Sequence, residues 1–157
     1  MHEPRSLTRE GIAALIPHSG AMCLLARLDA WDPQHIVCSA RNYRDADHPL
    51  RTRRGLLAPC AIEYAAQAMA LHGALIGQAT GSPASPGYLA SARGVRLHVL
   101  RLDDLAPLDG AADELRVEAT RQAGDARQIL YAFTVRHGEQ LLVEGRAAVV
   151  LNTVLAA

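Results

Sequence analysis

The sequence predicts an α+β domain in which an antiparallel sheet is wrapped around one central apolar helix. The stretch from Pro59 to about Gln78 is apolar on every side, and a helix of that kind is normally covered by other structure. Four later runs alternate apolar and polar residues, which is typical of half-buried antiparallel strands. Two short runs before the helix bring the expected sheet to six strands.

The segments before the helix are short. Leu7 to Ile16 is expected to form a first helix, stopped by the proline that follows. Met22 to Trp31 and Gln34 to Tyr43 are predicted to pair as a hairpin around an Asp-Pro turn. Arg44 to Ala58 has no apolar period and predicts a long loop that enters the helix at Pro59, a residue suited to a first helical position.

The second half of the chain is predicted to be strands. A Gly/Pro/Ser connection from Ala79 to Gly87 ends the helix. The alternating runs lie around Val95 to Val99, Leu115 to Thr120, Ile129 to Val135 and Leu141 to Leu151.

Length and composition indicate one domain, residues 1–157, with enough apolar residues to bury a core. Sixteen basic and sixteen acidic residues give a formal charge of zero, which argues against a nucleic-acid binder or a polybasic membrane-surface protein. The apolar helix holds Glu63, and an acidic residue inside a membrane span costs about 2.5 kcal/mol or more. We therefore expect no membrane association.

Three cysteines without a CxxC pair, and an N-terminal stretch without an apolar core, are typical of a reducing compartment. The expected location is the cytoplasm. No zinc-ligand spacing and no glycine-rich phosphate loop is visible, so neither a metal nor a nucleotide or flavin cofactor is predicted.

Glu63 is the main candidate for chemistry. It lies about one turn into the apolar helix, with Gln67 at i+4 on the same face. Because a buried carboxylate is costly unless it is paired or hydrogen-bonded, Glu63 needs a reason to be there. Either it caps the start of its own helix, or it is a general acid or base in a dry pocket. His48, in the adjoining loop, is a solvated residue or a second group for proton exchange.

The stretch from His48 to Gln67 resembles the hotdog-fold 3-hydroxyacyl-[acyl-carrier-protein] dehydratases. The matching or nearly matching positions are His48, Pro49, Pro59, Glu63, Ala66 and Gln67, with Ile16-Pro17-His18 upstream. The chain is most similar to the divergent predicted dehydratases of aryl-polyene and pigment clusters. It shares their GAMCLL string at Gly20 to Leu25 and their IEYAAQAMA string at Ile62 to Ala70.

The resemblance implies dehydration of 3-hydroxyacyl thioesters on acyl carrier protein to trans-2-enoyl thioesters, in fatty-acid or polyene-type synthesis. His48 would remove the α-proton, Glu63 would protonate the departing hydroxyl and Gln67 would hold Glu63. The N–H of Cys60 would polarise the thioester carbonyl. No cofactor is implied beyond the phosphopantetheine that carries the substrate, and a homodimer or a heterodimer with a related hotdog subunit is expected.

The chain departs from the family pattern around His48. The loop between His48 and Glu63 is one residue longer, the Phe after the histidine is missing, and the Pro-Gly at the helix start is Pro59-Cys60. These departures affect the placement of His48 more than the role of Glu63.

Three further interpretations stay open. Arg51, Arg53 and Arg54 are either a solvated loop or a docking patch for an acidic carrier protein or the phosphate of its pantetheine arm. His18 either lines the substrate pocket or hydrogen-bonds beside the preceding proline. Cys60 is a possible nucleophile at a helix N-terminus, although no activating base other than His48 is evident.

Two other functions compete with dehydration. An acyl-thioester hydrolase on the same fold would use Glu63 to activate water. A non-catalytic subunit would pair with an active homologue and supply a tunnel or a docking surface.

Overall fold

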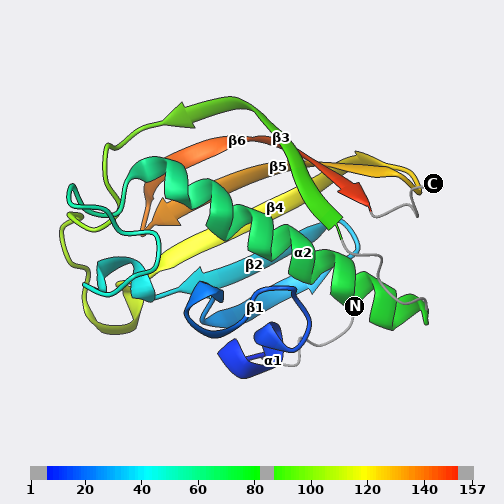
Figure 1. Ribbon diagram of the computed structural model, residues 1–157, viewed down its shortest axis with the longest axis horizontal. Helices are drawn as coiled ribbons and strands as arrows, with labels where there is room; N and C mark the ends of the chain where they lie inside the picture. The colour runs from blue at the N-terminus through cyan, green and yellow to red at the C-terminus, as the bar shows by residue number, and fades with distance from the viewer. Residues whose placement is uncertain (1–6, 82–86, 152–157) are drawn as a thin grey trace.

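The computed structural model describes residues 7–81 and 87–151, and it contains one six-stranded antiparallel sheet (Figure 1). The strand order is β1-β2-β4-β5-β6-β3, so β1 and β3 form the two edges. The strands are β1 Arg27–Asp32, β2 His35–Ala40, β3 Gly87–Leu97, β4 Leu115–Gly124, β5 Gln128–His137 and β6 Gln140–Leu151. The predicted fold class is confirmed. Most of the Gly/Pro/Ser connection lies outside the described residues.

The long helix α2 spans Ala61–Thr80, close to the predicted range. A 3₁₀ turn at Ala58–Cys60 leads into it, and its Pro59 has the fixed φ that suits a helix start. The helix ends at Gly81, whose φ of +70° is the left-handed conformation that glycine adopts at low cost.

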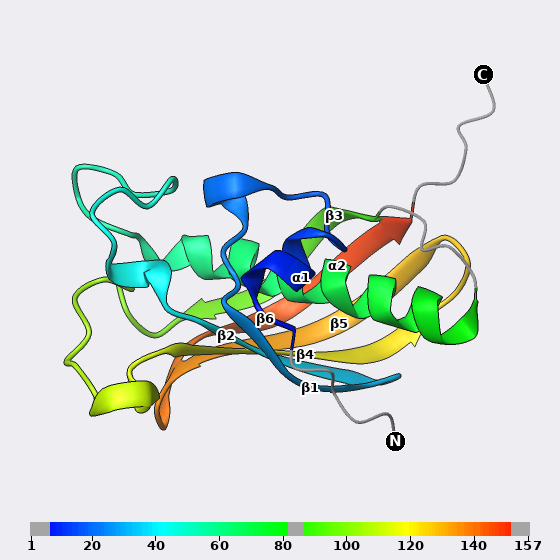
Figure 2. The same cartoon turned by 90° about the horizontal axis from the view of Figure 1, so that it is seen from below.

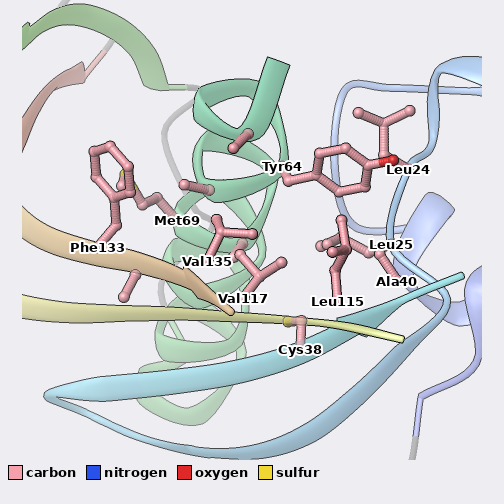
Figure 3. Packing of buried hydrophobic residues seen from close by; sticks show 14 of the residues in the cluster. Leu24, Leu25, Cys38, Ala40, Tyr64, Met69, Leu115, Val117, Phe133 and Val135 are labelled. Atoms are coloured by element: carbon pink, nitrogen blue, oxygen red, sulfur yellow. The ribbon is translucent and has the colours of Figure 1, made fainter. Parts of the chain in front are cut away.

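Helix α2 lies across the concave face of the sheet and packs on β2, β4 and β5 (Figures 1 and 2). Leu25, Tyr64, Leu115, Phe133 and Val135 are among the buried residues between the layers (Figure 3). The helix is not enclosed all round. The face that bears Glu63, Ala66, Ala70 and Gly73 is only half-buried.

The segment before β1 differs from the prediction. Helix α1 spans only Arg9–Ala13, and the first predicted strand begins at Arg27 rather than Met22. Part of the reason is Gln67, whose buried amide hydrogen-bonds Leu24 N and Met22 O. These backbone groups are therefore paired with a side chain instead of a neighbouring strand.

The loop between β2 and α2 is anchored at its start by Asp113. The Asp113 carboxylate accepts hydrogen bonds from Tyr43 Oη at 2.8 Å and Arg44 Nη2 at 3.0 Å, and it lies 2.8 Å from His137 Nε2. Arg44, His137 and Tyr43 hold the pKa of Asp113 well below its usual range. Arg44 is thus held in an ion pair with Asp113 that fixes the start of this loop.

No helix in the described part of the chain is long and apolar enough to cross a membrane.

Candidate active site

Glu63 lies in the first turn of α2, where its Oε1 atom is held by two side chains. His18 Nε2 is 3.0 Å from Oε1, and Gln67 Nε2 donates to the same oxygen at 3.2 Å. The Glu63 side chain is 32% exposed, so it borders solvent instead of lying in a dry pocket. Glu63 is the acidic residue of the first turn, as the self-capping interpretation expects, but its Oε1 is paired with side chains and not with a backbone N–H of the helix start.

Gln67 is fully buried, and both its amide oxygen and its amide nitrogen are hydrogen-bonded. Its Oε1 accepts from Leu24 N at 2.9 Å, while Nε2 donates to Met22 O at 2.7 Å as well as to Glu63. Because backbone on both sides fixes the amide, Gln67 can offer a rigid N–H to Glu63. This is the contact that the resemblance implies.

His18 contacts Glu63 directly, which favours the pocket interpretation over a hydrogen bond beside Pro17. Its side chain is 27% exposed, but its Nδ1 atom is buried and has no hydrogen-bond partner among the described residues. The sequence motif placed His18 in the candidate site; the pairing with Glu63 could not be inferred because the two residues are far apart in the chain.

His48 is buried and does not contact Glu63 of the same chain. Leu50 N donates to its Nδ1 at 3.0 Å, and its Nε2 is 2.9 Å from Tyr64 Oη, which donates to Asn42 Oδ1 at 2.7 Å. This pattern fits a neutral ring with the proton on Nε2. Burial lowers the pKa of His48, which also favours the neutral ring.

Cys60 is half-buried beside the helix start. Its N–H donates to Leu57 O at 3.0 Å, so the donor expected for the thioester carbonyl is used within the 3₁₀ turn. Burial raises the pKa of the Cys60 thiol, which argues against the nucleophile interpretation because the thiolate is the reactive form.

The three arginines at 51–54 do not share one environment. Arg51 Nη1 is 3.2 Å from the buried carboxylate of Asp103, which also accepts from Arg101 and from Leu56 N. The side chains of Arg53 and Arg54 are exposed and have no ion-pair partner in the described part of the chain.

Gly55 closes this turn with a φ of +101°. A Cβ there would lie 2.6 Å from Arg101 Nε and 2.7 Å from Asp103 Oδ1, so the close packing requires glycine. The turn that presents Arg53 and Arg54 is therefore well defined.

An apolar cavity of about 300 Å³ lies further along the Glu63 side of α2. Ala70, one of its lining residues, shares a helix face with Glu63, because seven residues are close to two turns. Ile16 and Pro17, which precede His18, line another side. Gly73 also lines it, and a Cβ at Gly73 would meet nothing within 4 Å. The sequence did not predict this cavity, because alanine and glycine occur on every side of the helix and mark no single face.

No group of three or more potential metal-ligating side chains occurs among residues 7–81 and 87–151.

The six-stranded antiparallel sheet over one long helix is the hotdog fold, which thioesterases and dehydratases share. The dehydratase heterocomplex ApeI:P from Xenorhabdus doucetiae has a chain with a TM-score of 0.79 and 22% identity, over 96% of this chain and 94% of that one. A putative thioesterase from Shewanella oneidensis gives a TM-score of 0.61 and 14% identity, over 92% and 94%.

A hypothetical thioesterase with coenzyme A from Streptococcus pneumoniae gives a TM-score of 0.56 and 9% identity, over 80% and 84%. No curated protein sequence matches the chain. The family model described as ApeP dehydratase matches residues 10–156, and the chain belongs to this ApeP-like dehydratase family. The resemblance stated from the sequence is thereby confirmed.

Proposed function

We propose that the protein dehydrates 3-hydroxyacyl thioesters, carried on the phosphopantetheine of an acyl carrier protein, to trans-2-enoyl thioesters. The single observation that carries the proposal is Glu63, anchored through Oε1 at the start of α2 and partly open to solvent. An apolar cavity begins about 10 Å further along the same helix face, at Ala70. Family membership supports the dehydratase class. No bound cofactor is needed for this chemistry.

In the proposed reaction a base takes the proton from the α-carbon, the bond between the β-carbon and its hydroxyl breaks, and Glu63 gives the hydroxyl a proton. Water leaves and the α–β double bond forms. The family pattern assigns the base to His48. Because both ring nitrogens of His48 are hydrogen-bonded, His48 can accept a proton only after its network with Tyr64 and Leu50 opens.

The cavity supports a substrate with an apolar chain. Its lining side chains are apolar apart from that of Tyr131, whose hydroxyl is 2.8 Å from His72 Nδ1 and therefore already partnered. An acyl chain extending from Glu63 along α2 would reach Ala70 after about 10 Å, since the helix rises about 1.5 Å per residue.

Arg53 and Arg54 are the proposed contacts for the carrier protein. Their exposed, unpaired guanidinium groups suit carboxylate or phosphate partners, whereas Arg51 is already committed to Asp103.

The test compares turnover of 3-hydroxybutyryl carrier protein and of a short soluble 3-hydroxybutyryl thioester. Glu63→Gln is expected to abolish formation of the enoyl product from both substrates while the melting temperature stays close to that of the wild type. Charge reversal at Arg53 and Arg54 is expected to weaken turnover of the carrier-bound substrate alone. Undiminished turnover by Glu63→Gln would rule out the proposed role of Glu63.

A non-catalytic subunit is the second candidate, favoured by the closed hydrogen-bond network of His48. The same assays on the complex with a hotdog subunit that copurifies from the native host separate the two. If Glu63→Gln leaves the activity of the complex unchanged, this chain supplies no reacting group. Release of free thiol from a simple acyl thioester would indicate a hydrolase instead.

A further inference from the structure

We propose that His18 is the positioning residue for Glu63: it donates Nε2–H to Oε1 and leaves Oε2 as the oxygen that exchanges a proton with substrate. This inference rests on the proposed function, and it specifies which oxygen reacts and which histidine fixes it.

The two oxygens of Glu63 have different surroundings. Oε1 is 3.0 Å from His18 Nε2 and 3.2 Å from Gln67 Nε2, whereas Oε2 has no hydrogen-bond partner among the described residues. Two donors that approach Oε1 from separate parts of the chain restrict rotation of the carboxylate. Oε2 is therefore the oxygen left for a ligand.

The surroundings of His18 fix which ring nitrogen carries the proton. Nδ1 is buried without a partner, so a proton placed there would leave a buried N–H donor with no acceptor. Such orphaned donors are rarer in proteins than under-used acceptors. The ring therefore keeps its proton on Nε2 and donates it to Glu63, and in this state Nε2 has no lone pair with which to take an α-proton.

The loop that carries His18 is itself held in place. Ile16 is buried in the core, and its N–H donates to Ile12 O at 3.1 Å, which ties the residue before Pro17 to the end of α1. On the other side of His18, Arg9 Nη2 donates to Gly20 O at 2.8 Å. His18 thus approaches Glu63 from a fixed direction.

The test uses His18→Leu and His18→Gln. Leucine fills the space without donating, so kcat is expected to fall by about 10²-fold with little change in KM, since the carboxylate loses its orientation. Glutamine places an N–H close to the position of Nε2, and it is expected to restore most of kcat. His35→Leu is the matched control, because His35 also pairs with a carboxylate, Glu118, at 3.1 Å but lies on β2.

Two results would overturn the proposal. If His18→Gln is as inactive as His18→Leu while both remain folded, His18 exchanges the proton itself. If His18→Leu keeps the wild-type kcat, the contact does not orient Glu63.

A second measurement does not depend on turnover. Nitrogen NMR of the His18 ring is expected to show Nε2 protonated and Nδ1 bare in the wild type, and the Nε2 signal is expected to shift in Glu63→Leu. A ring protonated on Nδ1 would contradict the proposal even in an active enzyme. Conversely, if NMR shows the expected tautomer but the protein does not dehydrate the substrate, the proposed function is overturned while the contact between His18 and Glu63 stands.

Discussion

The histidines of this chain differ in burial and in hydrogen bonding, and these differences determine how readily each ring can exchange a proton. His18 is half-exposed and touches a carboxylate, whereas His48 and His72 are buried, with both ring nitrogens hydrogen-bonded. Because neutral rings satisfy these buried networks, the neutral forms of His48 and His72 stabilise the fold. His48 can act as the proposed base only when its network opens.

A dependence of stability on pH follows from the buried pair. Burial lowers the pKa of His48 and of His72 below the ordinary value of 6.5. Below that value the unfolded chain binds protons that the folded chain does not, so the free energy of unfolding falls as the pH falls. At about pH 5.5 the loss is at most about 1.4 kcal/mol for each histidine. Above the ordinary value neither histidine changes stability with pH.

Urea unfolding between about pH 7.5 and about pH 5.5 measures this effect. His72→Gln keeps hydrogen-bonding capacity but cannot titrate, and it is expected to lower the dependence on pH over this range. The same dependence in the wild type and in His72→Gln would contradict the assignment for His72.

The sequence predicted part of this residue-level arrangement. The i+4 spacing placed Gln67 on the Glu63 face, as observed. It could not predict that His18 is the histidine at Glu63, because their approach depends on how the chain folds back before β1. Nor could it predict the Tyr64 contact of His48, which depends on the path of a loop without periodicity.

At the scale of elements, α2 was predictable because its residues are apolar over many turns. The face of α2 that is left half-buried was not predictable, because alanine and glycine occur on every side of the helix and give no contrast between its faces. The cavity that Gly73 lines lies on this half-buried face.

Gly73 is expected to leave room in the cavity for a long acyl chain. Gly73→Ala should raise the free energy of unfolding by up to about 1 kcal/mol, because alanine favours the helix and its Cβ meets open space. Gly73→Leu should fill the cavity and lower kcat/KM for long acyl chains while short ones are spared.

The position lies about 15 Å along the helix from Glu63, so the effect is expected only for chains of that reach. Ala79→Leu, at an exposed position near the end of α2, is the control. Equal losses for short and long chains in Gly73→Leu would contradict the expected role of Gly73.

At the scale of the whole molecule, the sheet has an edge strand that residues 7–81 and 87–151 leave uncovered. Among the strands of the described residues, β3 pairs only with β6, and it exposes Tyr88, Leu89 and Leu97. Exposed apolar side chains on an unpaired edge favour association with another protein. This surface suits the expected hotdog partner.

Tyr88→Glu combined with Leu97→Glu is expected to prevent association with the copurifying hotdog subunit, as measured by native mass spectrometry. The melting temperature of the isolated chain should change little, because both side chains are exposed. Ala30→Glu on β1, the opposite edge, is expected to leave the complex intact. Persistence of the complex in the β3 variant would place the interface elsewhere.

The short segment Ile16–His18 connects two parts of the site that are otherwise separate. Ile16 and Pro17 line the cavity, and His18 contacts the Glu63 carboxylate. An acyl chain that contacts Ile16 and Pro17 is therefore expected to affect the position of His18 and, through it, the orientation of the Glu63 carboxylate. Longer substrates are then expected to turn over faster, and not merely to bind more tightly, because contact energy gained far from the scissile bond is used to align the reacting oxygen.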